Sequence, residues 1–293
     1  MRINEKFGIY IILFLLFSIN LNCTTVIKVI KPESEKDVRQ QYYEKILILA
    51  LEKTKSKYGE YKIERVDIGY QGRSATLLAE GSPMLDLIWT MTNREREKTM
   101  LPVRIPLLKG LMGYRLLIIN KNNAEKFKNI KNIEELKKLT AVQGHDWPDT
   151  EILIANGFKV EKATIYEGMF KMISLKRVDY FPRGLNEPFD EIKNRPKLNL
   201  MVESSIMLKY FAPFFFFVNV KRADLRDRIE EGLNIAIDDG SFDELFYSDI
   251  SNKEMLDKVN FNKMKIFELE NPYLTPETKK LQNNKKYIFQ IKQ

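Results

Sequence analysis

The sequence of 293 residues contains a single cysteine, Cys23, and a single histidine, His145. One thiol cannot form an internal disulfide, and one cysteine with one histidine cannot supply the ligands of a Cys/His zinc site. The same counts argue against a Cys–His catalytic pair within the folded body. The sequence therefore predicts no disulfide framework and no metal site.

Motifs that mark common enzyme classes are absent as well. The chain has no Gly-x-Gly-x-x-Gly, no phosphate-loop lysine motif, no Gly-x-Ser-x-Gly and no metal-binding histidine pair. Among its 40 acidic residues, no spacing singles out two carboxylates for general acid–base work. His145 beside Asp146 could act as a base with its orienting group, but a loop histidine bonded to its neighbours is the favoured interpretation. We therefore predict a non-catalytic protein that needs no cofactor.

Charge of one sign does not gather in any one stretch. Lys and Arg number 48 against 40 Asp and Glu, a net charge of +8, which would suit a polyanion if the excess lay on one face. Basic and acidic residues instead alternate along 121–138 and 221–231, as on a solvated helix surface. Nucleic acid is therefore not an expected partner. The length and the 44% hydrophobic content suit a globular chain of two domains.

The first 22 residues have the pattern of a signal peptide. Arg2 and Lys6 precede an apolar run from Phe7 to Leu21, which is shorter than the about 20 apolar residues that span a bilayer. An uncleaved N-terminal membrane anchor is the alternative. Export predicts a periplasmic or cell-envelope location.

Cys23 directly follows this run, at the place of the lipidated cysteine in a bacterial lipoprotein. Asn20 and Asn22 occupy the positions where a lipobox has an aliphatic and a small residue, so the match is imperfect. Two outcomes stay open: a lipid-anchored chain that begins at Cys23, and plain signal cleavage nearby.

Strand and helix patterns alternate through the rest of the chain and predict largely parallel sheets. The strands of a first unit are expected at 26–30, 61–68 and 85–89, and those of a second unit at 140–143, 159–165, 178–181 and 198–202. Later come an apolar strand at Phe214–Val220, interpreted as core rather than as a ligand cage, and an amphipathic helix at 222–238. Residues 279–293 stay unassigned.

The segment from Gln143 to Thr150 has the pattern of an anion-binding helix start. Gly144 permits close backbone approach, and a helix initiated by Pro148 presents free N–H groups and the positive end of its dipole. The alternative is that Gly144 only turns the chain and Trp147 packs underneath. Three further segments follow strand ends and are expected to meet this loop in one cleft: 71–73, 89–96 and 180–184.

Short motifs in a fixed order support this reading: 85–96 (LDLIWTMTNRER), 104–107 (RIPL), 113–118 (GYRLLI), 132–136 (NIEEL), 142–144 (VQG), 166–170 (YEGMF) and 176–180 (KRVDY). Together they resemble the bacterial extracytoplasmic solute-binding proteins of the polar-amino-acid type, known as family 3, over residues 27–246. The resemblance implies an α/β, bilobed, type II periplasmic-binding-protein-like fold. Two α/β lobes would be joined by two crossing strands, Leu116–Asn120 and Phe214–Val220. Lobe one would comprise 25–116 and 218–293 with the tail, and lobe two 117–217.

The resemblance also implies where the solute binds. Thr90, Thr92 and Arg96 stand at the lobe-one carboxylate site, and Arg73 stands at a position that contacts the solute's side chain. The lobe-two helix start supplies Gly144, His145, Trp147 and Thr150. Two departures matter: the spacing from Thr92 to Arg96 is one residue longer than usual, so Arg94 could compete, and Pro32 leads into a helix where the family has a hairpin.

A third departure bears on the solute. The lobe-two acid that binds an α-amino group in the family is replaced by the turn Phe181–Gly184, and Arg183 there would repel an ammonium group. We therefore expect an anionic or multiply hydroxylated small solute held by Arg73, Arg96 and Arg183.

Hinge closure without bond chemistry is the implied mechanism. The chain would act as a monomer that serves a membrane permease in an uptake system. The alternative is a sensor or partner-recognition lipoprotein on the same fold. An enzyme on this fold is disfavoured, because no catalytic set is visible.

Overall fold

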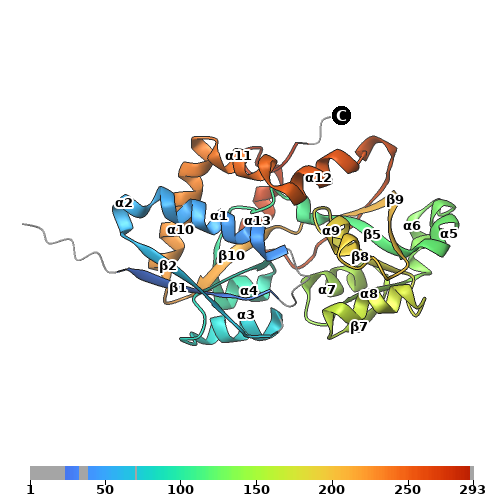
Figure 1. Cartoon of the computed structure of the whole chain (residues 1–293), viewed down its shortest axis with the longest axis horizontal. Helices are drawn as coiled ribbons and strands as arrows, with labels where there is room; N and C mark the ends of the chain where they lie inside the picture. The colour runs from blue at the N-terminus through green and yellow to red at the C-terminus, as the bar shows by residue number, and fades with distance from the viewer. Residues whose placement is uncertain (1–23, 33–38, 70, 291–293) are drawn as a thin grey trace, which may run out of the picture.

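The computed structural model describes residues 24–32, 39–69 and 71–290. Two α/β units lie side by side along the long axis, each built around one sheet (Figure 1). We call the unit around the five-stranded sheet lobe one and the unit around the six-stranded sheet lobe two. The predicted bilobed α/β fold is confirmed. The predicted signal peptide, 1–22, and Cys23 lie outside the described residues.

The lobe-one sheet has the strand order β2-β1-β3-β10-β4. β1 pairs in parallel with β2 and β3, whereas β10 runs antiparallel to β3 and β4. The strands are β1 (Thr25–Ile30), β2 (Tyr61–Val66), β3 (Leu87–Met91), β4 (Met100–Val103) and β10 (Phe214–Asn219). The helices are α1 (Arg39–Lys53), α2 (Lys55–Tyr58), α3 (Gln71–Glu80), α4 (Arg94–Thr99), α10 (Ala223–Asp238) and α11 (Ser241–Ser248).

Helices α1 and α10 lie over the same face of this sheet (Figure 1). The four-residue spacing predicted from the sequence buries Leu225, Ile229 and Leu233 of α10. Gly232 lets the two helices approach closely, because a Cβ there would lie 2.0 Å from the carbonyl oxygen of Ala50 in α1.

The lobe-two sheet has the order β11-β9-β5-β8-β6-β7. β5 is antiparallel to both β8 and β9, while β6 is parallel to β7 and β8. The strands are β5 (Tyr114–Asn120), β6 (Thr140–Gly144), β7 (Lys159–Ala163), β8 (Tyr180–Gly184), β9 (Leu200–Lys209) and β11 (Lys265–Glu268). The helices are α5 (Ala124–Lys128), α6 (Ile133–Lys137), α7 (Pro148–Ala155), α8 (Tyr166–Ser174) and α9 (Pro188–Lys193). The 3-10 turns of the whole chain are η1 (Leu111–Gly113), which directly precedes β5, η2 (Lys121–Asn123), η3 (Phe261–Lys263) and η4 (Leu281–Asn283), which lies near the C-terminus.

The two expected crossing strands do not cross. Leu116–Asn120 lies within β5 of lobe two, and Phe214–Asn219 forms β10 of lobe one. The chain passes between the sheets along 104–113 and 210–213. Each of the two apolar strands lies inside its own sheet with a strand on both sides. Side chains on both of its faces are buried, which explains its continuously apolar sequence.

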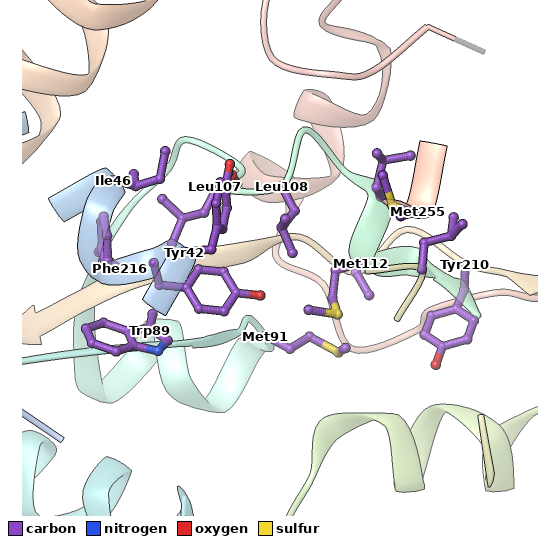
Figure 2. Close-up of a cluster of buried hydrophobic side chains, with 14 of the residues drawn as sticks. Tyr42, Ile46, Trp89, Met91, Leu107, Leu108, Met112, Tyr210, Phe216 and Met255 are labelled. Atoms are coloured by element: carbon purple, nitrogen blue, oxygen red, sulfur yellow. The ribbon is translucent and has the colours of Figure 1, made fainter. Parts of the chain in front are cut away.

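The first passage is itself packed into the core. Leu107, Leu108 and Met112 join the buried cluster that runs from Tyr42 and Trp89 in lobe one towards Tyr210 at the start of the second passage (Figure 2). The two lobes are therefore connected through apolar packing as well as through the backbone.

The C-terminal region also differs from the expectation that 218–293 belongs to lobe one. Helix α12 (Ile250–Lys258) packs against α9, and β11 adds an edge strand to the lobe-two sheet beside β9. Helix α13 (Pro276–Lys280) then returns to lobe one, where Thr275 and Thr278 donate hydrogen bonds to Glu97. We call residues 249–280 the C-terminal strap. The sequence predicts a strand at 265–269 but does not show which sheet it joins, because a strand of four residues carries little pattern.

The described part of the tail that the sequence left unassigned, up to residue 290, packs on lobe one. The ring of Phe289 lies 6.3 Å from that of Phe246, and its N–H donates to the carbonyl of Lys109. Among the described helices, none is both long and apolar enough to cross a membrane.

Candidate functional site

A hollow lies between the two lobes where both passages meet the sheets. Lobe one contributes Met91 and Phe214, and the first passage contributes Met112; the lobe-two lining comprises Arg115, Trp147, Pro148, Asp149, Arg183 and Glu187. Figure 2 shows Met91 and Met112 next to each other, with the hydroxyl of Tyr210 directed away from them. The space open to water-sized molecules is about 30 Å³, enough for one or two waters. A larger solute therefore needs the lobes to part.

Lobe one brings the predicted Thr90, Thr92 and Arg96 together. Asn93 caps α4 by accepting from the backbone N–H of Arg96 at 2.8 Å, which sets Arg96 on the first turn of that helix. Nη1 of Arg96 donates to Oγ1 of Thr90 at 2.5 Å and to the carbonyl of Met91 at 2.8 Å. The hydroxyl of Thr92 points the other way and donates to Glu97 at 2.6 Å. Arg96 is not itself among the residues that line the hollow, but it contacts the backbone of Met91, which is one of them.

Burial lowers the pKa of the Arg96 guanidinium to about 10, and the carboxylates of Asp146 and Asp149 in lobe two oppose this shift. The charge of Arg96 is thus already attracted to acids on the facing lobe. Arg94, the competing candidate, is exposed and donates to the carbonyls of Pro272 and Leu274 in the strap. Of the two candidates, Arg96 therefore faces the cleft and Arg94 does not, although the spacing from Thr92 to Arg96 is one residue longer than usual.

The segment from Gly144 to Thr150 folds as a tight strand-to-helix connection. Oγ1 of Thr150 donates to the carbonyl of Gly144 at 2.6 Å. A Cβ on Gly144 would lie 2.6 Å from the ring of Trp147, and that ring stacks on Phe181 at 6.2 Å. This packing agrees with the alternative interpretation, in which Gly144 turns the chain and Trp147 packs underneath it. His145 is exposed, and its Nδ1 lies 3.8 Å from Asp146.

Asp146 connects the two lobes. Its Oδ2 accepts from the backbone N–H of Gly72 at 2.5 Å, in the first turn of α3. A carboxylate at that position interacts favourably with the positive end of the helix dipole. Arg73, the next residue of α3, is exposed to solvent and is absent from the residues that line the hollow.

Arg183 is buried and already paired. Its Nη2 lies 2.6 Å from Glu187 and 2.8 Å from Glu191, and its Nε donates to Glu191 at 2.9 Å. Burial alone would lower its pKa, but the charges of Glu187 and Glu191 raise it above the ordinary value. The guanidinium also stacks over Trp147 at 5.0 Å. The expectation of Arg183 as a free cation for an anionic solute is therefore corrected.

Glu187 places an acid at the end of β8, where the sequence predicted only an arginine. Its Oε2 accepts from the backbone N–H of Gly184 at 2.6 Å. A Cβ on Gly184 would lie 2.4 Å from Sδ of Met112 and 3.0 Å from Glu187. Glycine at 184 thus makes room for a carboxylate supplied three residues later.

Arg115 and Asp149 form the other charged pair of the hollow, and the sequence analysis did not select either. Nη2 of Arg115 lies 2.7 Å from Asp149, and its Nη1 lies 3.7 Å from Glu187. The Tyr210 hydroxyl donates to Asp149 as well. One signal was present, since Arg115 is the single charged residue of the strand YRLLIIN. Asp149 and Glu187 gave no such signal, because acids at or just before the first turn of a helix are common on surfaces.

Comparisons with known proteins bear on the fold. No protein-family model and no curated relative matches the chain. Solved structures are similar to the chain. An ancestral arginine-binding protein bound to glutamine has 16% identity and a TM-score of 0.59, over 78% of this chain and 99% of that chain. A protein described as an ABC-transporter binding component from Wolinella succinogenes, complexed with lysine, has 17% identity and a TM-score of 0.57, over 80% of this chain and 99% of that chain, and a histidine kinase sensor domain similar to periplasmic binding proteins has 13% identity and a TM-score of 0.57, over 76% and 93%. The resemblance to family 3 binding proteins is therefore confirmed for the fold.

Proposed function

We propose that the chain is a non-catalytic solute-binding protein that closes its lobes on an amino acid. The observation that carries the proposal is the charge balance around the hollow. Three guanidinium groups, those of Arg96, Arg115 and Arg183, face four carboxylates, those of Asp146, Asp149, Glu187 and Glu191. A zwitterion brings one charge of each sign to such a mixed lining.

The anionic solute expected from the sequence is not retained. That expectation depended on free arginines, and Arg183 is matched by Glu187 and Glu191 while Arg73 is exposed. An added anion would meet a lining with more carboxylates than guanidinium groups, so its desolvation would not be offset. In our proposal the solute carboxylate binds near Arg96, and its ammonium group binds near Asp149 and Glu187.

Similar structures support an amino acid as the solute, since one is described as bound to glutamine and another to lysine. The second is also described as a component of an ABC transporter. We therefore propose a role in uptake, at the outer side of the membrane and with a membrane permease as partner. Export through the 1–22 segment, with lipidation of Cys23 or cleavage nearby, would bring the chain to that location.

Isothermal titration of the purified protein tests the proposal. The panel contains amino acids with neutral, cationic and anionic side chains, dicarboxylates without an amino group, sugars and inorganic phosphate. Micromolar binding of an amino acid supports the proposal. Binding of a dicarboxylate, a sugar or phosphate with no binding of any amino acid overturns it, and chemical conversion of a bound solute, followed by mass spectrometry, overturns the non-catalytic assignment.

A pair of arginine variants tests the proposed carboxylate contact. Arg96→Met should weaken amino acid binding about 10- to 100-fold, since a hydrogen bond to a charged group contributes about 1.5–3 kcal/mol. Arg94→Met is the matched control, because Arg94 is exposed and contacts the strap. It should leave the affinity within about twofold. The opposite ranking would assign the contact to Arg94.

A sensor is the second candidate function, and the similarity to a histidine kinase sensor domain favours it. Both functions use the same solute site and differ in the partner. Uptake of radiolabelled solute by cells with and without the chain separates them, because loss of the chain stops uptake only in the transport case.

A further inference from the structure

Arg115 stands apart from the other charged residues of the hollow. It is the second residue of the central strand β5, it is 2% exposed, and it lines the hollow. Within the part of the chain that the structure describes, its Nε has no hydrogen-bond acceptor. Its Nη2 lies 2.7 Å from Oδ1 of Asp149, which also accepts from the Tyr210 hydroxyl, because a carboxylate oxygen can accept from two donors. Arg183 beside it, by contrast, donates to Glu187 and Glu191 from both Nε and Nη2.

A buried N–H group without an acceptor is costly in free energy, and native proteins keep few of them. When the lobes part and close on a solute, a donor on the wall of the hollow is satisfied if the bound molecule brings an acceptor. We propose that Arg115 is a specificity-determining residue that donates to an uncharged acceptor, an amide or hydroxyl oxygen, on the side chain of the solute. This inference rests on the proposed function, because it assumes an amino acid in the hollow.

The surrounding charges decide which acceptor fits. A second carboxylate beside Arg115 would also lie beside Asp149 and Glu187, which are 2.7 Å and 3.7 Å from the guanidinium. Three carboxylates around one guanidinium would repel one another strongly in a buried site. An amide carbonyl accepts from Arg115 without that repulsion, and the amide NH₂ donates to either carboxylate. Met91, Met112 and Phe214 provide apolar contacts for the methylene groups of the solute.

Titration of the full chain with glutamine, glutamate and methionine tests the inference, because these side chains are similar in length and differ in the end group. We expect glutamine to bind at least about tenfold more tightly than either. Glutamate binding equal to or tighter than glutamine would show that Arg115 acts as a net cation and overturns the inference. Methionine binding equal to glutamine overturns it too. If no amino acid binds while a non-amino-acid solute does, the proposed function fails and this inference fails with it.

Arg115→Lys keeps a positive charge between Asp149 and Glu187 but removes Nε and the planar fork. We expect the preference for glutamine over methionine to fall to within about twofold, with the thermal unfolding midpoint little changed. Arg115→Met, which removes all donors, should abolish the same preference. If that variant does not fold, the lysine variant alone decides.

Arg195→Lys is the matched control. Arg195 is an equally buried arginine of lobe two, paired with Glu167 and absent from the residues that line the hollow. Its variant should keep the full preference for glutamine. An equal loss of preference in the Arg195 variant would mean that any weakened lobe two loses it, and would overturn the role of Arg115.

Discussion

The two walls of the hollow hold their charges in different ways. Within lobe one, Arg96 donates to the Thr90 hydroxyl and the Met91 carbonyl, which are neutral, and its charge is attracted by Asp146 and Asp149 of lobe two. The lobe-two wall packs charged side chains that are each less than a tenth exposed and that pair with one another: Arg115, Asp149, Arg183, Glu187 and Glu191. Removing Arg96 therefore breaks contacts within lobe one and an attraction between the lobes, whereas removing a charge of the lobe-two wall breaks buried ion pairs within that lobe.

The largest expected effect comes from breaking the lobe-two network. Glu191→Ala leaves Arg183 with Glu187 as its carboxylate partner and removes the acceptor of the Tyr166 hydroxyl. Removing one partner of a buried ion pair costs about 3–5 kcal/mol. Urea denaturation followed by circular dichroism should show a loss of that size in the free energy of unfolding.

The control for this variant is Glu134→Ala, which removes an exposed glutamate of lobe two paired with Lys137. An exposed pair of this kind contributes about 0.5 kcal/mol or less. Equal losses for the two variants would contradict the view that lobe two depends on its buried charges.

The corresponding lobe-one variant, Glu97→Ala, should cost less, about 1–3 kcal/mol. The Glu97 side chain is 1% exposed and accepts from Thr92, Thr275 and Thr278 as well as from Arg104. Three of these donors are neutral hydroxyls, and Arg104 is 36% exposed, so its charge returns to water when Glu97 is removed. The same denaturation experiment measures the loss, with the exposed Glu95→Ala of the same helix as control. A loss as large as that of Glu191→Ala would remove the difference between the walls.

Glu97 should also make stability depend on pH. Burial alone would raise its pKa, but the hydrogen bonds from Thr278, Thr92, Thr275 and Arg104 lower it below the ordinary value. A lowered pKa in the folded state means that the stabilisation is complete above the unfolded pKa of about 4.3 and is lost as pH falls through the folded value. The free energy of unfolding of the wild type should therefore approach that of Glu97→Gln as the pH falls from 7 to 3. Parallel curves for the two proteins would contradict this assignment.

The same contrast explains which parts of the site the sequence could predict. Thr90, Thr92 and Arg96 lie within seven consecutive residues, so a strand end and a capped helix bring them together through local geometry. Arg115 and Glu187 lie on separate elements and meet only when β5 pairs with β8. Local patterns carry no information about such a contact.

The two main errors have a similar origin. The alternation of strands and helices predicted the bilobed fold, but the apolar strands taken as crossings were central strands, and centrality depends on neighbours that come from other parts of the chain. Arg183 was interpreted as a cation for the solute because its partners were not recognised. Glu187 and Glu191 lie just before and within α9, and the sequence did not show where that helix lies relative to β8.

The smallest expected effect concerns the contact that joins the walls. Asp146→Asn keeps the shape of the side chain but removes the charge that accepts from Gly72 at the start of α3 and faces Arg96. Loss of a carboxylate at a helix start costs about 1 kcal/mol, which corresponds to about a fivefold shift towards parted lobes. Hydrogen exchange in the peptide that contains Gly72 should become faster, while Asp227→Asn, at an exposed aspartate of α10, should leave it unchanged. Because this contact involves both walls, unchanged exchange in Asp146→Asn would mean that the lobes stay together through the packed passage and the strap alone.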